Sequence, residues 1–68
     1  MSVITSDQEV LGGALVFKGT RVPVRNLFDY LMAGNNTKDF LEDFSTVSFE
    51  QIRFVLQSAE TAIENEVA

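Results

Sequence analysis

Apolar and polar positions divide this chain into a short extended part and a longer part with helical periodicity. Apolar residues run from Ala14 to Phe17, give way to the polar stretch Lys18–Arg21, and resume at Val22. Two short apolar runs on either side of a glycine-containing turn are typical of a β-hairpin. Residues 1–22 are therefore predicted to form a small β-hairpin or an extended arm.

Two further features refine this N-terminal prediction. Thr5-Ser6-Asp7 carries turn-forming side chains, so residues 1–12 are expected to be irregular. Pro23 cannot donate a hydrogen bond to a neighbouring strand, which leaves two alternatives. Either the second strand ends at Pro23, or Pro23 is the first residue of the following helix, where its fixed φ is favourable.

The rest of the chain has apolar residues at helical spacing, which predicts three helices. The first is expected over Pro23–Ala33, with Gly34 ending it. The second is short and is expected over Lys38–Phe44, after an N-cap at Asn36 or Thr37.

The third helix has the clearest beginning, because Ser48 and Gln51 match a capping box. From there to about Glu66, one face carries the apolar residues that we expect to be buried: Ile52, Val55, Leu56, Ala59 and Ile63. At about 100° per residue, Phe54 points roughly 160° away from that stripe. Phe54, Ser58 and Thr61 are therefore predicted to form an oligomer interface; the alternative is one exposed apolar residue of the kind common on monomers.

The order of helix, short helix, turn and longer helix is that of a helix-turn-helix. We therefore predict a mainly α fold with one domain over residues 1–68. Residues 23–68 would form a three-helix homeodomain-like bundle, with the helix-turn-helix at about 37–66. A chain of 68 residues without cysteine or histidine has neither disulfides nor the usual zinc ligands. Association with itself or with a partner is the expected source of further stability.

Charge is distributed unevenly along the chain. The net charge is −5, yet Lys18, Arg21 and Arg25 bring three of the five basic residues into eight positions. This corner is the expected contact with any negatively charged partner. Arg21 also has a structural alternative, since it could hold a local carbonyl or pair with Asp29 or Asp7.

Other function classes find little support in the residues. Without histidine or cysteine, proton transfer would fall to carboxylates, lysine or tyrosine, and no catalytic set is present. We expect no enzyme activity, no cofactor and no metal site. No apolar run reaches the ~20 residues that span a membrane, and residues 1–10 lack the features of a signal peptide. A cytoplasmic protein without a membrane partner is expected.

DNA binding is the remaining class to weigh. The start of the second helix of a helix-turn-helix contacts the major groove. Gln51 could read adenine and Arg53 guanine there, with Ser48 beside them and Lys38 reaching phosphates. The acidic balance weakens attraction to phosphates, so such binding is expected to need a dimer. A compact bundle used for protein contacts is the alternative.

Several blocks of sequence together resemble a known family. They are the double glycine at 12–13, the run Val16-Phe17-Lys18-Gly19-Thr20-Arg21-Val22-Pro23-Val24, the apolar helix that ends at Gly34, and Phe40-Leu41-Glu42-Asp43-Phe44. Over roughly residues 4–63, the chain resembles the VapB-like antitoxins catalogued as domain-of-unknown-function family 433. It departs from them at Ala14-Leu15, where a polar pair is frequent, and at Ser45, where proline is usual.

The resemblance implies a function as well as a fold. It implies a homeodomain-like helix-turn-helix with a short N-terminal β element, in an antitoxin that neutralises a PIN-like ribonuclease toxin and binds its own operator. The expected toxin-binding residues are Leu15, Val16, Phe17, Lys18, Arg21 and Arg25. The cations would enter the toxin's acidic metal site, within a homodimer or a higher toxin–antitoxin assembly. A free-standing DNA-binding regulator without a toxin is the alternative.

Overall fold

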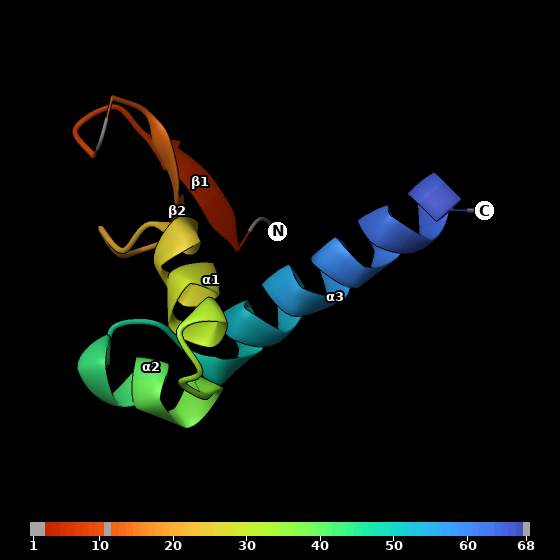
Figure 1. The fold of residues 1–68 in the computed structure, drawn as a ribbon. Helices are drawn as coiled ribbons and strands as arrows, with labels where there is room; N and C mark the ends of the chain where they lie inside the picture. Colours follow the sequence, from red (N-terminus) through yellow and green to blue (C-terminus); the bar gives the residue numbers. More distant parts are fainter. Residues whose placement is uncertain (1–2, 11, 68) are drawn as a thin grey trace.

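The computed structural model describes residues 3–10 and 12–67, which form a two-stranded sheet followed by three helices (Figure 1). The elements are β1 (Ile4–Asp7), β2 (Ala14–Phe17), α1 (Val24–Met32), α2 (Thr37–Asp43) and α3 (Phe49–Val67). The predicted mainly α fold with an N-terminal β-hairpin is confirmed. Residues 1, 2, 11 and 68, which fall within the predicted arm and domain, lie outside the described residues.

The hairpin forms between different segments from those predicted. β1 pairs antiparallel with β2, with Ile4 opposite Phe17 and Asp7 opposite Ala14. The prediction of irregular structure is therefore wrong for residues 4–7. Asp7 does supply turn chemistry, but at the end of the strand, where its carboxylate accepts a hydrogen bond from the backbone N–H of Glu9 at 2.9 Å.

The predicted pairing of residues 14–17 with residues 22–24 is reduced to one bridge between Val16 and Pro23. The backbone N–H of Phe17 donates to the carbonyl of Val22 at 3.1 Å, so the chain does turn back on itself here. Pro23 is then the N-cap of α1, with φ −63°. Its missing N–H ends the pairing, and its fixed φ leads into the helix.

The ends of α1 and α2 follow local capping rules. Gly34 has φ 92°, and its N–H donates to the carbonyl of Leu31 at 3.1 Å, which ends α1 as predicted. Asn36 is the N-cap of α2: its side chain accepts from the Asp39 N–H at 2.8 Å, and the Asp39 carboxylate accepts from the Asn36 N–H at 3.1 Å. Asn36 was one of the two predicted caps, whereas its reciprocal partner was not foreseen.

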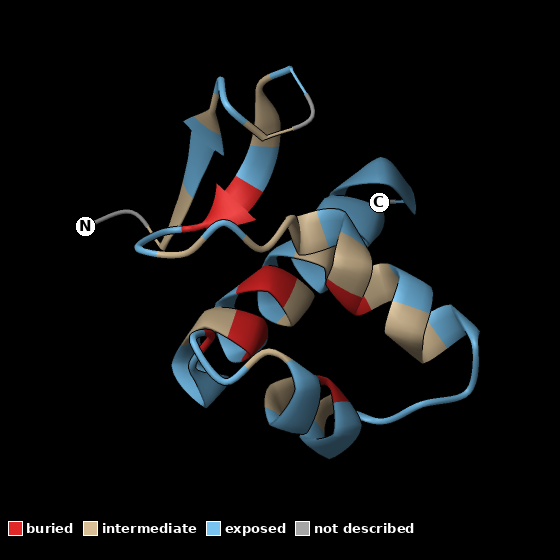
Figure 2. Cartoon of the chain, turned by 90° about the vertical axis from the view of Figure 1, so that its left-hand side faces the viewer, coloured by how far each residue is buried: buried red, intermediate tan, exposed pale blue. Residues whose placement is uncertain are grey.

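Helix α3 begins as predicted and extends beyond the body of the molecule. The Ser48 hydroxyl accepts from the Gln51 N–H at 3.2 Å, and the Gln51 side-chain oxygen accepts from the Ser48 N–H at 3.0 Å. The predicted burial of Ile63 is wrong, because this residue is 61% exposed. The helix has left the core by that point (Figure 1), and its C-terminal end is coloured as exposed in Figure 2. Among the described residues, no helix is long and apolar enough to cross a membrane.

One hydrophobic core joins the hairpin to the helices. Its buried residues come from β2, each helix and the α2–α3 turn: Phe17, Leu27, Phe40, Val47, Ile52 and Val55. Phe40 contributes most aromatic contacts, with ring centroids 6.1 Å from Phe17, 5.3 Å from Tyr30 and 4.8 Å from Phe44. The turn that follows Phe17 is therefore anchored directly on the helical core.

Candidate protein-binding surface

The turn after β2 is a rigid platform for two cations. Gly19 has φ 84°, a value in the left-handed region that glycine favours. The Thr20 hydroxyl donates to the carbonyl of Phe17 at 2.7 Å and accepts from the N–H of Val22 at 3.0 Å. These bonds connect the two ends of the turn, from which the exposed side chains of Lys18 and Arg21 extend.

A second tether connects this turn to the start of α3. The side-chain N–H of Gln51 donates to the carbonyl of Lys18 at 2.9 Å, across 33 positions of sequence. Gln51 thus closes the cap of α3 and holds the turn at the same time. Both its amide oxygen and its amide nitrogen have protein partners in this structure.

The cations of this corner form only weak ion pairs. Arg21 lies 3.9 Å from Glu9, and Arg25 lies 3.9 Å from Asp29 one helical turn later. Arg21 therefore pairs with neither of the carboxylates that the sequence suggested. The Arg21 and Glu9 side chains are 70% and 81% exposed, so solvent screens their attraction. Both guanidinium groups remain accessible to a partner.

An apolar depression lies beside these cations. It is lined by Ala14, Leu15, Pro23, Val24, Arg25 and Phe28. Leu15 is 58% exposed, so one predicted apolar anchor is available to a partner. Val16 and Phe17 are at most 1% exposed and are not available, which corrects two of the predicted contacts. Phe17 packs against Phe40, and Val16 is covered where β2 meets Pro23.

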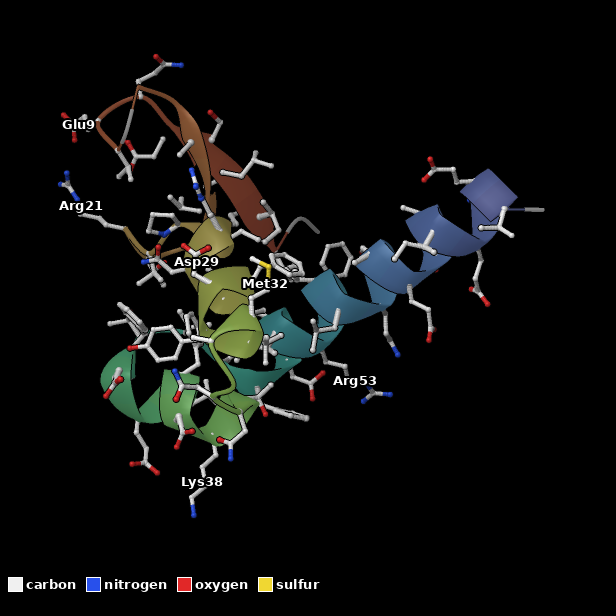
Figure 3. All side chains as sticks on the ribbon, viewed as in Figure 1. Glu9, Arg21, Asp29, Met32, Lys38 and Arg53 are labelled. Carbon is white, nitrogen blue, oxygen red and sulfur yellow. The ribbon has the colours of Figure 1, made fainter. Side chains whose placement is uncertain are left out.

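The predicted DNA-binding residues do not gather into one basic surface. Lys38 lies at the end of the molecule opposite Arg21, and Arg53 extends sideways from α3 (Figure 3). Ser48 and Gln51 satisfy each other in the capping box. Arg53 is exposed, but Gln51 would have to give up two hydrogen bonds before its amide could read a base.

The predicted oligomer surface lies on the outer side of α3. Phe54 is 47% exposed, and Ser58 and Thr61 are exposed near it. A shallow hollow runs along this face, lined by Phe54, Gln57, Ser58, Thr61, Ala62 and Asn65. The structure therefore keeps the three predicted residues together on one accessible face.

An acidic depression between α1 and α2 was missed at the sequence level. It is lined by Tyr30, Asn35, Asp39, Glu42 and Asp43. The Tyr30 hydroxyl donates to Asp43 at 2.6 Å. That hydrogen bond, desolvation and the nearby Asp43 and Asp39 charges raise the pKa of Tyr30 above its ordinary value. The only signal in the sequence was a tyrosine on the first helix and carboxylates on the second.

These features define a small mainly α domain with an N-terminal hairpin. The chain belongs to the family described as protein of unknown function (DUF433), whose family model matches residues 4–59. It is 36% identical over 58 residues to the uncharacterized protein y4eO of Sinorhizobium fredii. That match covers 85% of this chain but only 26% of the relative. No solved structure matches the chain.

Proposed function

We propose that this protein is the antitoxin of a type II toxin–antitoxin pair and neutralises a PIN-like ribonuclease by direct binding. The observation that carries the proposal is the corner where the rigid turn with Lys18 and Arg21 adjoins the depression beside Arg25. Membership of the DUF433 family agrees with the resemblance from which the antitoxin hypothesis came. The proposal concerns this domain, since the chain spans about a quarter of the relative it matches.

The corner supplies a means of inhibition. A ribonuclease of this kind holds its divalent metal with carboxylates, and an arginine can pair with a carboxylate in a strong, geometrically selective way. Arg21 extends from the hydrogen-bonded turn, and its ion pair with Glu9 is long and exposed. Lys18 would contribute a second charge from the same turn. Leu15 would seat against an apolar surface of the toxin, in place of the buried Val16 and Phe17.

The proposal is tested first by isolating the partner. Tagged protein is recovered from its native lysate after nuclease treatment, and bound proteins are identified by mass spectrometry. A ribonuclease recovered in stoichiometric amount is then assayed for RNA cleavage with and without the purified chain. Inhibition by the chain supports the proposal, whereas full cleavage in a stable complex contradicts it.

Substitutions then test the surface. Arg21→Ala and Lys18→Ala are expected to weaken both binding and inhibition of that ribonuclease. Lys38→Ala is the matched control, because it removes the same charge at the opposite end of the molecule (Figure 3). Equal inhibition by all three variants would refute the cationic contact while leaving the antitoxin role open.

A free-standing DNA-binding regulator is the second candidate. The order of α2, turn and α3 favours it, together with an exposed Arg53 near the start of α3. It predicts that the purified chain binds a DNA fragment from its own promoter without any protein partner. Loss of that binding in Arg53→Ala, with the helical content unchanged, would place the contact on α3. Both functions fit one protein if the antitoxin also binds its operator.

A further inference from the structure

The chain exposes more surface than a compact monomer of its mass. Its accessible area is 4868 Å², whereas a folded monomer of 7.6 kDa is expected to expose about 4,300 Å². Its radius of gyration is 12.3 Å, against about 11 Å for a compact domain of this length. The departure comes from α3, in which every residue from Glu60 to Val67 is exposed. An isolated helical end of this kind is marginal in water and gains stability from a neighbour.

We propose that α3 binds α3 of a second copy of this chain, in antiparallel orientation, through the outer face formed by Phe54, Ser58, Thr61 and Asn65. This inference does not depend on the proposed function, since the outer face shares no residue with the proposed toxin-binding corner. The outer face points away from the core, since Phe54, Ser58, Thr61 and Asn65 are all exposed.

The shape of the face fits its own copy. Phe54 protrudes at one end, and the hollow continues beside it along Ser58, Thr61 and Ala62. With the two-fold axis between Gln57 and Ser58, each Phe54 lies at the level of the other copy's Thr61. Each ring then fills the hollow of the other helix. The contact buries an aromatic side chain twice, as a symmetric interface requires.

Charge complementarity selects the antiparallel orientation. At about 100° per residue, Arg53, Glu60 and Glu64 all lie on the same flank of the outer face. Antiparallel helices place this flank against the same flank of the second copy. Each Arg53 then lies at the level between Glu60 and Glu64 of the other chain. A parallel pair would instead place the flank against the opposite one, which carries Ala62 and Glu66. Glu66 is 13 positions from Arg53 along the helix, too far to pair with it in a parallel arrangement.

The same argument rejects the opposite face of α3 as the dimer contact. Ile63 and Val67 are exposed there, but Glu60, Glu64 and Glu66 accompany them without a basic residue. A second copy docked on that end would bring like charges together. The outer face carries Glu50 near one end, but its flank also carries Arg53, a basic residue that the opposite face lacks.

Sedimentation equilibrium of the full chain at increasing concentration tests the proposal. The mass is expected to rise from 7.6 kDa to twice that value. Phe54→Glu should remain a monomer at every concentration, whereas Ile63→Glu, a matched change on the opposite face, should still dimerise. Circular dichroism verifies that both variants are helical. A monomeric parent chain, a dimeric Phe54→Glu variant, or a monomeric Ile63→Glu variant would each overturn the proposal.

Two further variants test the orientation. The chain has no cysteine, so single cysteines can be introduced cleanly. Ser58→Cys lies beside the axis and should form a disulfide between copies on mild oxidation, whereas Asn65→Cys should not. Disulfide formation by both variants would indicate a parallel pair and refute the orientation. Arg53→Glu should weaken the dimer, and adding Glu60→Arg and Glu64→Arg to the same chain should restore it; failure of this rescue refutes the ion pairing.

Discussion

Gly19 offers a sharp test of how the cationic turn is held. Its φ of 84° lies in the left-handed region, and a Cβ placed on it would meet nothing within 4 Å. Any penalty for Gly19→Ala therefore comes from the backbone rather than from a clash. The turn it occupies lies between Lys18 and Arg21, so its conformation also sets the direction of the proposed binding side chains.

The magnitude follows from two opposing effects. An L-residue in the left-handed region costs about 1–2 kcal/mol. Replacing glycine also reduces the conformational freedom of the unfolded chain, which raises the free energy of unfolding by about 0.4–1 kcal/mol. The net loss in the free energy of unfolding is thus about 0–1.6 kcal/mol, with a midpoint of about 0.8 kcal/mol. With an unfolding entropy of about 2.1 cal/mol/K per residue over 68 residues, each 1 kcal/mol lowers Tm by about 7 °C.

Thermal unfolding followed by circular dichroism measures this loss. Gly19→Ala is expected to lower Tm by about 6 °C at the midpoint of this range, and by no more than about 11 °C. A synthetic chain with D-alanine at position 19 is the matched control, because a D-residue favours positive φ and adds the same methyl group. It should unfold at or above the Tm of the parent chain. Equal losses from both alanines would refute the reasoning and point to a contact made by the methyl group.

Three further predictions concern the core, a helix cap and a titrating group. Phe40→Ala should lower the free energy of unfolding by about 3–5 kcal/mol. The total for a chain of this length is about 3–10 kcal/mol. Circular dichroism should therefore show a largely unfolded Phe40→Ala chain, whereas Phe40→Leu should stay folded. Ser48→Ala should lower stability by about 1 kcal/mol through loss of the α3 cap, and Ser48→Asp should restore it in the same thermal assay. Tyr30 is the one tyrosine of a chain without tryptophan, so ultraviolet absorbance should report its pKa above the ordinary value near 10. The hydrogen bond from the protonated Tyr30 should stabilise the folded state fully below about pH 10. This contribution should be lost as the pH rises through the pKa of Tyr30 in the folded chain. An unchanged pKa of Tyr30 in Asp43→Asn would contradict Asp43 as the cause.

Local signals in the sequence predicted most helix boundaries. Gly34 ended α1, Ser48 and Gln51 capped α3, and Pro23 preceded the first helical residue. Each of these features depends on residues within a few positions of one another. The physical preferences involved are a φ value, a missing N–H and a side chain that reaches a nearby backbone group. Such preferences act before any tertiary contact forms, and a sequence contains them in full.

The hairpin shows where that reasoning failed. Three of the four residues at 4–7 are polar and form turns readily, so nothing local distinguishes them as a strand. They become β1 because β2 offers an edge with unpaired backbone groups, and because Ile4 packs against the core beside Phe17. Strand pairing depends on a partner elsewhere in the chain, and the β-propensity of a segment's own residues does not predict that partner.

The candidate binding surface also combines features that the sequence predicts with features that appear only in the folded structure. The sequence by itself determined which cations lie close together, because Lys18, Arg21 and Arg25 are neighbours along the chain. Only the tertiary structure decided that Leu15 faces solvent while Val16 and Phe17 are buried, and that Gln51 holds the turn from α3. The reason is that burial and long-range hydrogen bonds depend on how separate elements pack. Charge, caps and glycine positions are properties of the chain, whereas exposure is a property of the assembled fold.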